Sequence, residues 1–278
     1  MFCYDKKGEK KPFYRHVPKL IDSGVPVVIL IHGWRRLMDL KWMDDVALDY
    51  RKYNNSSNVC LIYWEELAWE IDLMKLKEES LPKVVRRTAH FIKLLHEDHG
   101  ISYDDISLVG HGIGAHIAGA ASNKVDNKVG KIYALDPFGP LYSTYIQENP
   151  AGRLDPKDAK YVQALYTSSN VLGTELIVGH QNFKPNLGRT PQTPCLNSYM
   201  ELKFVCSHQL AVDYFRYSLN PEYEFTAMKC NRNITNYIVQ NCGKQHVYDR
   251  FGVHAEGISG VFYFEPFPAA PYVKTKDF

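Results

Sequence analysis

The chain has 278 residues, of which 45% are hydrophobic and 23% charged, a composition typical of a soluble globular protein with one sizeable core. A formal net charge of +2, with no basic stripe evident in the sequence, gives no reason to expect a nucleic-acid partner. No apolar run reaches the roughly 18 residues that a membrane span needs, so we expect no integral membrane association.

Short apolar runs alternate with helical patterns through the first half of the chain. The run Val27–Ile31 and the run at 59–64 are predicted as buried strands. The segment Leu81–His99 repeats apolar residues at helical spacing, and Gly100 follows it where a helix-ending glycine is expected. The next predicted strand, at 106–109, leads into a glycine-rich turn and then a helix of small residues at 115–121.

The second half continues the alternation of strand and helix. Strands are predicted at Lys131–Leu135, 161–166 and 258–264, and a helix at 208–219. The proline-rich stretch at 179–206 is expected to form surface loops, one of them closed by a disulfide. This order predicts an α/β fold, a mostly parallel central sheet with helices on both faces, in a single domain spanning 1–278.

The turn after the 106–109 strand has the frame of a G-x-S-x-G nucleophile elbow. Here it reads Gly110-His111-Gly112-Ile113-Gly114, with glycine in the serine position. Strand, tight turn and helix form the context that this motif requires. A serine at this point attacks the substrate and forms the acyl-enzyme, and glycine has no side chain for that step. Neither neighbour of Gly112 is expected to replace the nucleophile, so the sequence raises the question of whether this protein is an enzyme.

The remaining triad positions can be assigned from chain order, which in this fold runs nucleophile, acid, base. Asp136 ends the predicted 131–135 strand and is the candidate acid, and His208 is the candidate base. The backbone N–H groups of Ile113 and Trp34 are the candidate oxyanion-hole donors. The simpler interpretation of Asp136 as a turn residue and of His208 as a core histidine stays open. The other histidines have no metal-ligand spacing, so no metal site is expected.

Six cysteines and three sequons bear on the compartment. Six cysteines allow 15 pairings, and sequence proximity suggests Cys195–Cys206 and Cys230–Cys242, which leaves Cys3 with Cys60. Six unpaired buried thiols are the alternative. The sequons predict glycosylation at Asn54 or Asn55 and at Asn233. Together these features predict a secreted, extracellular protein, although the start of the chain has no signal-peptide pattern.

Longer blocks of sequence resemble the pancreatic-lipase family, and most closely its insect branch of neutral lipases, short-lid phospholipases A1 and lipase-like yolk proteins. The blocks are IHGW at 31–34, VGHGIGAHIAG at 109–119, LDPFGPLY at 135–142, the segment 152–174, GHQNFKPN at 179–186 and CSHQLAVDYF at 206–215. The resemblance implies an α/β-hydrolase fold in which Asp136 and His208 are the acid and base. It also implies a short lid loop between Cys195 and Cys206, and no C-terminal β-sandwich domain.

Departures from the family pattern gather around the expected site. Phe138, Tyr166, Leu210 and Tyr63 join Gly112 in replacing the usual residues, and four of the five changes add apolar or aromatic bulk. They fit either drift after loss of activity or remodelling into an apolar pocket. The predicted ligand-binding cleft comprises Trp34, Gly112, Ile113, Phe138, Tyr166, His208 and Leu210.

The sequence therefore favours an inactive, secreted lipase homologue. It would carry or store a lipophilic molecule such as a fatty acid, hormone, sterol or pigment, or serve as a yolk-like reserve, with no catalytic cofactor. One alternative is an active-site-knockout form of a secreted triacylglycerol lipase or phospholipase A1. Another is a structural or recognition protein that uses its outer surface. A homo-oligomer is left open.

Overall fold

A computed structural model describes residues 1–14, 20–34, 39–54, 56–126, 128–143, 152–230 and 247–273. Its strands form one eleven-stranded sheet in the order β10-β9-β11-β8-β7-β6-β5-β3-β4-β1-β2. The seven strands from β11 to β4 pair in parallel, and the two at each end pair antiparallel. The strands are β1 Phe2–Tyr4, β2 Lys10–Pro12, β3 Val27–Ile31, β4 Asn58–Ile62, β5 Ile106–His111, β6 Lys131–Leu135, β7 Tyr161–Leu165, β8 Gln181–Pro185, β9 Thr226–Lys229, β10 Tyr248–Arg250 and β11 Gly260–Phe264.

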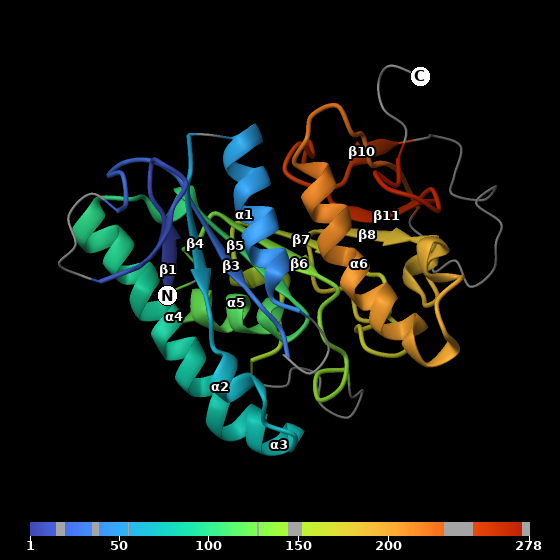
Figure 1. Ribbon diagram of the computed structural model, residues 1–278, viewed down its shortest axis with the longest axis horizontal. Helices are drawn as coiled ribbons and strands as arrows, with labels where there is room; N and C mark the ends of the chain where they lie inside the picture. Colours follow the sequence, from blue (N-terminus) through green and yellow to red (C-terminus); the bar gives the residue numbers. More distant parts are fainter. Residues whose placement is uncertain are drawn as a thin grey trace.

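Helices cover both faces of this sheet (Figure 1). Helices α1 (Lys41–Tyr53) and α6 (Lys203–Ser218) pack on one face, and α4 (Leu81–His99) and α5 (Ile113–Asn123) on the other. Alternate residues of β3 point to opposite faces, so Val28 and Leu30 join the α1–α6 side while Val27, Ile29 and Ile31 join the α4–α5 side. The predicted α/β-hydrolase architecture, with its mostly parallel sheet, is confirmed.

Short helical segments complete the described structure. The chain approaches α4 through α2 (Glu65–Ala68), α3 (Leu73–Lys75) and a π-helical turn at Leu76–Ser80. The 3₁₀ turns are Tyr103–Asp105, Pro156–Asp158, Asn186–Gly188, Thr193–Cys195 and Met200–Leu202. No described helix is both long and apolar enough to cross a bilayer.

The helix α4 shows how directly sequence dictates structure in this protein. Its apolar residues recur at three- and four-residue spacing and are buried along one stripe. It ends where predicted, because Gly100 adopts a left-handed conformation (φ 65°, ψ 22°) and donates its N–H to the carbonyl of His96 at 3.1 Å.

The opposite face of α4 corrects one expectation. The exposed side chains of this helix between 83 and 93 are all basic, and they form a stripe that was not predicted. They are Lys83, Arg86, Arg87, His90 and Lys93. Helical periodicity collects residues that look scattered in the sequence, and acidic residues elsewhere balance them in the net charge.

The prediction of surface loops throughout 179–206 is wrong. The segment contains β8, which pairs in parallel with β7 and β11 inside the sheet. Prolines and polar residues concealed this strand, because its buried Asn182 is satisfied by tertiary partners rather than by apolar packing. The Asn182 amide donates to the carbonyl of Gly179 at 2.7 Å, and its Oδ1 accepts from the hydroxyl of Tyr166 at 2.8 Å.

Several boundaries also shift. Helix α6 begins at Lys203, five residues before the predicted start at His208. Helix α1 was not predicted. The strand predicted at 59–64 runs from 58 to 62 as β4, and the strand predicted at 161–166 ends at 165 as β7. The strand predicted at 258–264 begins at 260 as β11. The strand predicted at 106–109 continues to His111 as β5, and the helix predicted at 115–121 runs from Ile113 to Asn123 as α5.

Two of the three predicted disulfides are confirmed. Cys3–Cys60 joins the paired strands β1 and β4, and Cys195–Cys206 closes the predicted lid loop. The Cys230–Cys242 pairing stays a prediction because Cys242 lies outside the described residues, as do Asn55 and Asn233 of the sequons. Asn54 is exposed just after α1, where a glycan could be accommodated.

Candidate active site

The candidate site lies where parallel strands end at one edge of the sheet. Gly112 follows β5 directly, Asp136 follows β6, and the turn leading to Trp34 follows β3. These strands are neighbours in the sheet, so their carboxyl ends deliver the three segments to one place. His208 reaches the same place from α6, although it is 72 residues from Asp136 in sequence.

Close packing fixes the glycines of the elbow. A Cβ on Gly110 would lie 2.3 Å from the carbonyl oxygen of Gly114, and a Cβ on Gly114 would lie 2.2 Å from the carbonyl oxygen of Ile31. Both positions therefore require glycine so that α5 can approach β3 and β5. Gly112 itself has φ 55° and ψ −117°, a conformation that side chains rarely adopt. Its N–H donates to the carbonyl of Leu135 at 2.9 Å, which holds the turn.

Asp136 and His208 form a complete acid–base pair. His208 Nδ1 lies 2.6 Å from Asp136 Oδ2, and the carboxylate side chain is fully buried. Its Oδ1 accepts the backbone N–H groups of Thr167 at 2.7 Å and Ser168 at 3.0 Å, and the Ser168 hydroxyl donates to Oδ2. Burial alone would raise the pKa of the Asp136 carboxyl, but hydrogen bonds from His208, Ser168 and Thr167 hold it below its usual value. Asp136 is thus a carboxylate that orients the imidazole.

The backbone of Asp136 supports the same interpretation. Its φ of 44° is unusual for a residue other than glycine, and such conformations persist where the surroundings impose them. Gly173 packs against it so closely that an added Cβ would lie 2.5 Å from Asp136 Oδ1. The surrounding chain is therefore shaped around this carboxylate.

The imidazole of His208 faces the place where a nucleophile would stand. A Cβ added to Gly112 would lie 3.0 Å from His208 Nε2 and 3.3 Å from Cε1. A hydroxyl on that carbon would be within hydrogen-bonding reach of the imidazole. The acid and the base are in position, and the residue between them and a substrate has no side chain.

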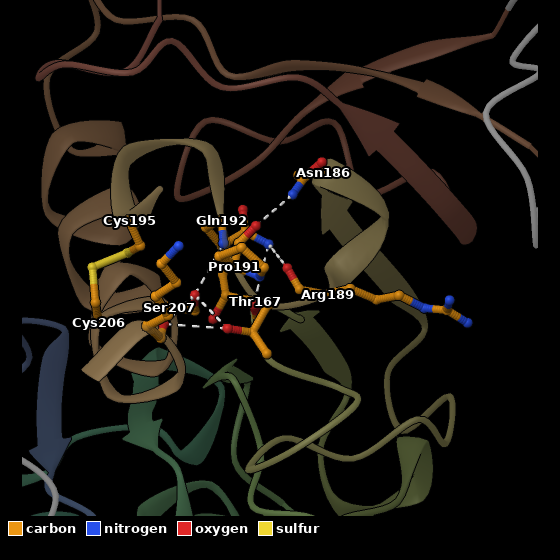
Figure 2. The surroundings of a disulfide bond; sticks show 10 residues. Thr167, Asn186, Arg189, Pro191, Gln192, Cys195, Cys206 and Ser207 are labelled. Atoms are coloured by element: carbon orange, nitrogen blue, oxygen red, sulfur yellow. Dashed lines mark hydrogen bonds between the residues drawn. A yellow bond between two sulfur atoms is a disulfide. The ribbon is translucent and has the colours of Figure 1, made fainter. Parts of the chain in front are cut away.

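A network beside the lid disulfide holds the start of α6 (Figure 2). The Ser207 hydroxyl donates to the carbonyl of Lys203 at 2.7 Å and accepts from Thr190 Oγ1 at 2.9 Å and from Gln192 N at 3.0 Å. The Gln192 amide in turn donates to the carbonyls of Thr167 at 3.1 Å and Pro185 at 2.9 Å. These bonds tie the residue before His208 to the ends of β7 and β8.

His111 is a supporting residue that was not predicted from the sequence. Its Nε2 donates to the backbone carbonyl of His208 at 2.9 Å, and the two imidazole rings lie 4.2 Å apart between centroids. Burial, followed by the proximity of His208, lowers the pKa of His111 to about 3, so its ring is neutral at physiological pH. His111 lies within the elbow motif, but no local pattern in the sequence indicates this role, because the contact is with a residue 97 positions away.

The oxyanion-hole prediction fits the local backbone at Ile113. Ile113 is the first residue of α5, and N–H groups in the first turn of a helix have no acceptor within the helix. The Trp34 indole is anchored by donating to the carbonyl of Glu70 at 2.9 Å. The assignment of the Trp34 backbone N–H as the second donor stays a prediction.

The predicted cleft residues are packed more tightly than expected. Phe138, Ile113, Leu210 and His208 are all at most 5% exposed, so little of their surface is available to a ligand. Tyr166 belongs to the core, where its hydroxyl donates to Asn182 and accepts the N–H of Val178 at 3.0 Å. Its inclusion in a ligand-binding cleft is therefore not supported by its position.

The lid loop contrasts with this packed centre. Between the two cysteines of the 195–206 disulfide, four large apolar side chains are exposed, and Tyr199 and Met200 reach 82% and 81%. The others are Leu196 and Leu202. This loop is the most exposed apolar part of the site's surroundings among the residues described.

Comparison with known proteins gives consistent matches. The sequence model of the family described as Lipase matches residues 20–261. The chain is 35% identical over 213 residues to probable phospholipase A1 magnifin of Vespa magnifica, covering 72% of this chain and 60% of that protein. It is 30% identical over 223 residues to lipase member H of Rattus norvegicus, covering 78% of this chain and 48% of that protein.

The coverage is unequal between the two sides of these alignments. The chain thus spans about half to 60% of the length of these curated relatives. Among solved structures, a carboxylesterase from Mesorhizobium loti matches 52% of this chain and 66% of that chain, with 15% sequence identity and a TM-score of 0.36.

Proposed function

Because this chain belongs to the lipase family, we propose that it is a family member that has lost ester hydrolysis and now binds a lipophilic molecule. In this proposal Gly112 stands in the nucleophile position, and Asp136 and His208 are the remains of a triad. The protein would act as a carrier of a fatty acid, hormone, sterol or pigment, or as a yolk-like storage protein. It would need no cofactor or metal.

One observation carries the loss of activity. His208 Nε2 points at the Cβ position of residue 112, and that residue is glycine. In a serine hydrolase, removal of the triad serine lowers kcat by about 10⁶, or about 8 kcal/mol of barrier. The rate left by an oxyanion hole and binding alone is about 10³-fold over water, which is negligible beside an active lipase.

The proposal includes secretion of the protein. Disulfides form and persist in oxidising compartments, and two are present among the described residues. The exposed position of Asn54 is compatible with glycosylation in the same pathway.

Ester hydrolysis can be tested directly. Purified wild-type protein and a His208→Gln variant would be assayed with p-nitrophenyl butyrate, a triacylglycerol emulsion and phosphatidylcholine vesicles. The proposal expects equal, background-level rates for both proteins. Rapid hydrolysis by the wild type that disappears in His208→Gln would refute it. Native mass spectrometry of the protein from its source would test the binding role, through a small molecule of defined mass that co-purifies.

The intact Asp136–His208 pair also favours a second candidate. An active secreted triacylglycerol lipase or phospholipase A1 whose serine had been replaced would retain this geometry. The natural gene or a natural peptide decides between the two. A serine codon at position 112 would establish the knockout, and a glycine codon would leave the binding protein.

A further inference from the structure

A cavity lies on the α4–α5 side of the sheet, away from the Asp136–His208 pair. Its volume is about 610 Å³, within the range of 300–1,000 Å³ typical of small-molecule sites. The first turn of α4 and the π-helical turn before it form one wall, and the middle of α5 forms the other. Helix α5 begins at the elbow, so its first residues belong to the candidate active site and its later residues line the cavity.

The walls of the cavity are apolar. Leu81 and Val85 of α4 face Ile117 and Ala120 of α5 across it. Leu81, Val85 and Ile117 belong to the core cluster and are themselves buried, so core side chains form part of the floor of this half-open cavity. A lining of this kind favours an aliphatic ligand chain.

A tyrosine hydroxyl provides the first polar group. Tyr142 is 2% exposed, and its ring stacks on His116 with centroids 3.8 Å apart. Tyr142 lines the cavity, and among the described residues its hydroxyl is not one of the buried polar atoms that lack a partner, so it keeps access to the cavity. Burial raises the pKa of this phenol, so it stays protonated and can donate to an acceptor in the cavity.

A lysine provides the second polar group. Lys77 Nζ lies 5.3 Å from the centre of the Tyr142 ring and donates to the carbonyl of Leu141 at 3.2 Å. These two contacts place the ammonium over the Tyr142 ring, and an ammonium has further N–H groups to offer. A second cation, Lys124, and one acid, Glu78, also line this cavity.

His116 adds shape but no charge. Its Nδ1 accepts the N–H of Leu154 at 3.0 Å, and its Nε2 donates to the carbonyl of Phe138 at 2.8 Å. Burial lowers the pKa of His116 to about 4, so the ring is a neutral platform under Tyr142 at physiological pH. The anion-binding groups of the cavity are therefore the phenol and the ammonium.

We propose that this cavity binds a long-chain fatty acid, with its carboxylate between the Tyr142 hydroxyl and Lys77 Nζ and its chain between α4 and α5. The carboxylate would satisfy the phenol and pair with the ammonium, and the chain would cover the apolar walls. The inference rests on the proposed function, because it names the site and the ligand class of a lipophilic carrier. It places that ligand outside the ancestral cleft, whose walls are packed.

The test uses cis-parinaric acid, a fluorescent fatty acid, with the delipidated full-length protein. The wild type is expected to bind one molecule saturably. Ala120→Trp, which fills a partly exposed position of the wall, should weaken binding by more than tenfold. Tyr142→Phe and Lys77→Met should each weaken it by about tenfold or more, since hydrogen bonds to charged groups have that effect. Lys83→Met, on the exposed face of α4, is the matched control and should bind as the wild type does.

A neutral probe separates the headgroup from the chain. The methyl ester of the same acid should bind the wild type about tenfold more weakly and should not respond to Lys77→Met. Thermal unfolding shows whether each variant is folded. If Ala120→Trp does not fold, the comparison rests on Tyr142→Phe and Lys77→Met.

The outcomes distinguish this site from the carrier role itself. Saturable binding that none of the three cavity variants weakens would overturn the site and leave the carrier role standing. Equal affinity for the acid and its methyl ester would overturn the carboxylate recognition. No binding of the probe to the wild type would overturn the fatty-acid assignment, and the mass of a co-purifying ligand would still decide the carrier role separately.

Discussion

Replacing Gly112 with serine should destabilise the protein, even though serine is the residue that the motif usually contains. A residue with a side chain at φ 55° and ψ −117° is strained, which costs about 1–3 kcal/mol. The new Cβ would also lie 3.0 Å from His208 Nε2, and His208 cannot move freely because Asp136 holds its other nitrogen at 2.6 Å. A hydrogen bond from the serine hydroxyl to Nε2 would return about 1 kcal/mol. The net loss is therefore about 0–2 kcal/mol from these two effects, and the 3.0 Å contact adds to it, so we expect about 1 kcal/mol or more.

Urea denaturation followed by tryptophan fluorescence measures this difference, and a Tm decrease of about 2–4 °C for each kcal/mol should accompany it. Gly112→Ala lacks the hydroxyl and should lose about 1 kcal/mol more than Gly112→Ser. Gly100→Ser is the matched control, because Gly100 also has positive φ but a Cβ there would meet nothing within 4 Å. An unchanged or raised stability of Gly112→Ser would refute the strain argument. Because Gly100 lies at ψ 22° and Gly112 at ψ −117°, a loss equal to that of Gly100→Ser would refute any added cost from the Gly112 backbone or from His208.

Three further predictions concern activity, pH and the lid. Gly112→Ser alone should give little esterase activity, because the bulk of Phe138 and Leu210 still disturbs the site, and turnover of p-nitrophenyl butyrate at the rate of an active lipase would contradict this. The folded-state pKa of His116 is lowered from 6.5 to about 4, so the unfolded state binds protons first as pH falls. The stability from this group is complete above pH 6.5 and should drop by about 2 kcal/mol between pH 6.5 and pH 5. Urea titrations should show a shallower pH dependence in His116→Gln and an unaltered one in a variant of the exposed His90. Replacing Cys195 and Cys206 with serine should reduce stability by about 2–3 kcal/mol at pH 7, and a double variant as stable as the wild type would show that the lid bridge does not restrain the unfolded chain.

Local patterns predicted the centre of the sheet well. The strand β3 consists of five apolar residues that are all buried, and α4 has the spacing of an amphipathic helix and a glycine at its end. In both, the residues that determine the element lie within it. Helix α1 could have been found in the same way, since its buried residues recur at helical spacing, from Trp42 through Val46 to Tyr50.

Strand β8 could not be predicted in this way. Three of its five residues are polar, and hydrogen bonds with other segments satisfy Gln181 and Asn182. One such partner is Asp249, 68 residues away, which accepts the Gln181 amide at 2.6 Å. The burial of Tyr166 depends on the same strand, because the acceptor for its hydroxyl is a residue of β8.

The candidate site was predictable to the extent that motifs mark strand ends. The elbow, Asp136 and His208 were identified in the sequence, and the structure brings them together. The contribution of His111 depends on a contact with the backbone of His208, 97 residues away, which no local pattern reveals. Tight packing of the cleft likewise depends on several elements at once.

The outer edge of the sheet at β2 has a consequence for self-association. All three residues of this strand are exposed, and two are lysines while the third, Pro12, has no N–H to donate. Lys10 and Lys11 are held there by ion pairs with Asp44 and Asp5 at 2.8 Å and 2.6 Å. Charged side chains and the absence of an N–H group on Pro12 make the exposed edge of β2 a poor partner for another strand. These features disfavour the extension of one continuous β-structure by two copies of this protein across that border.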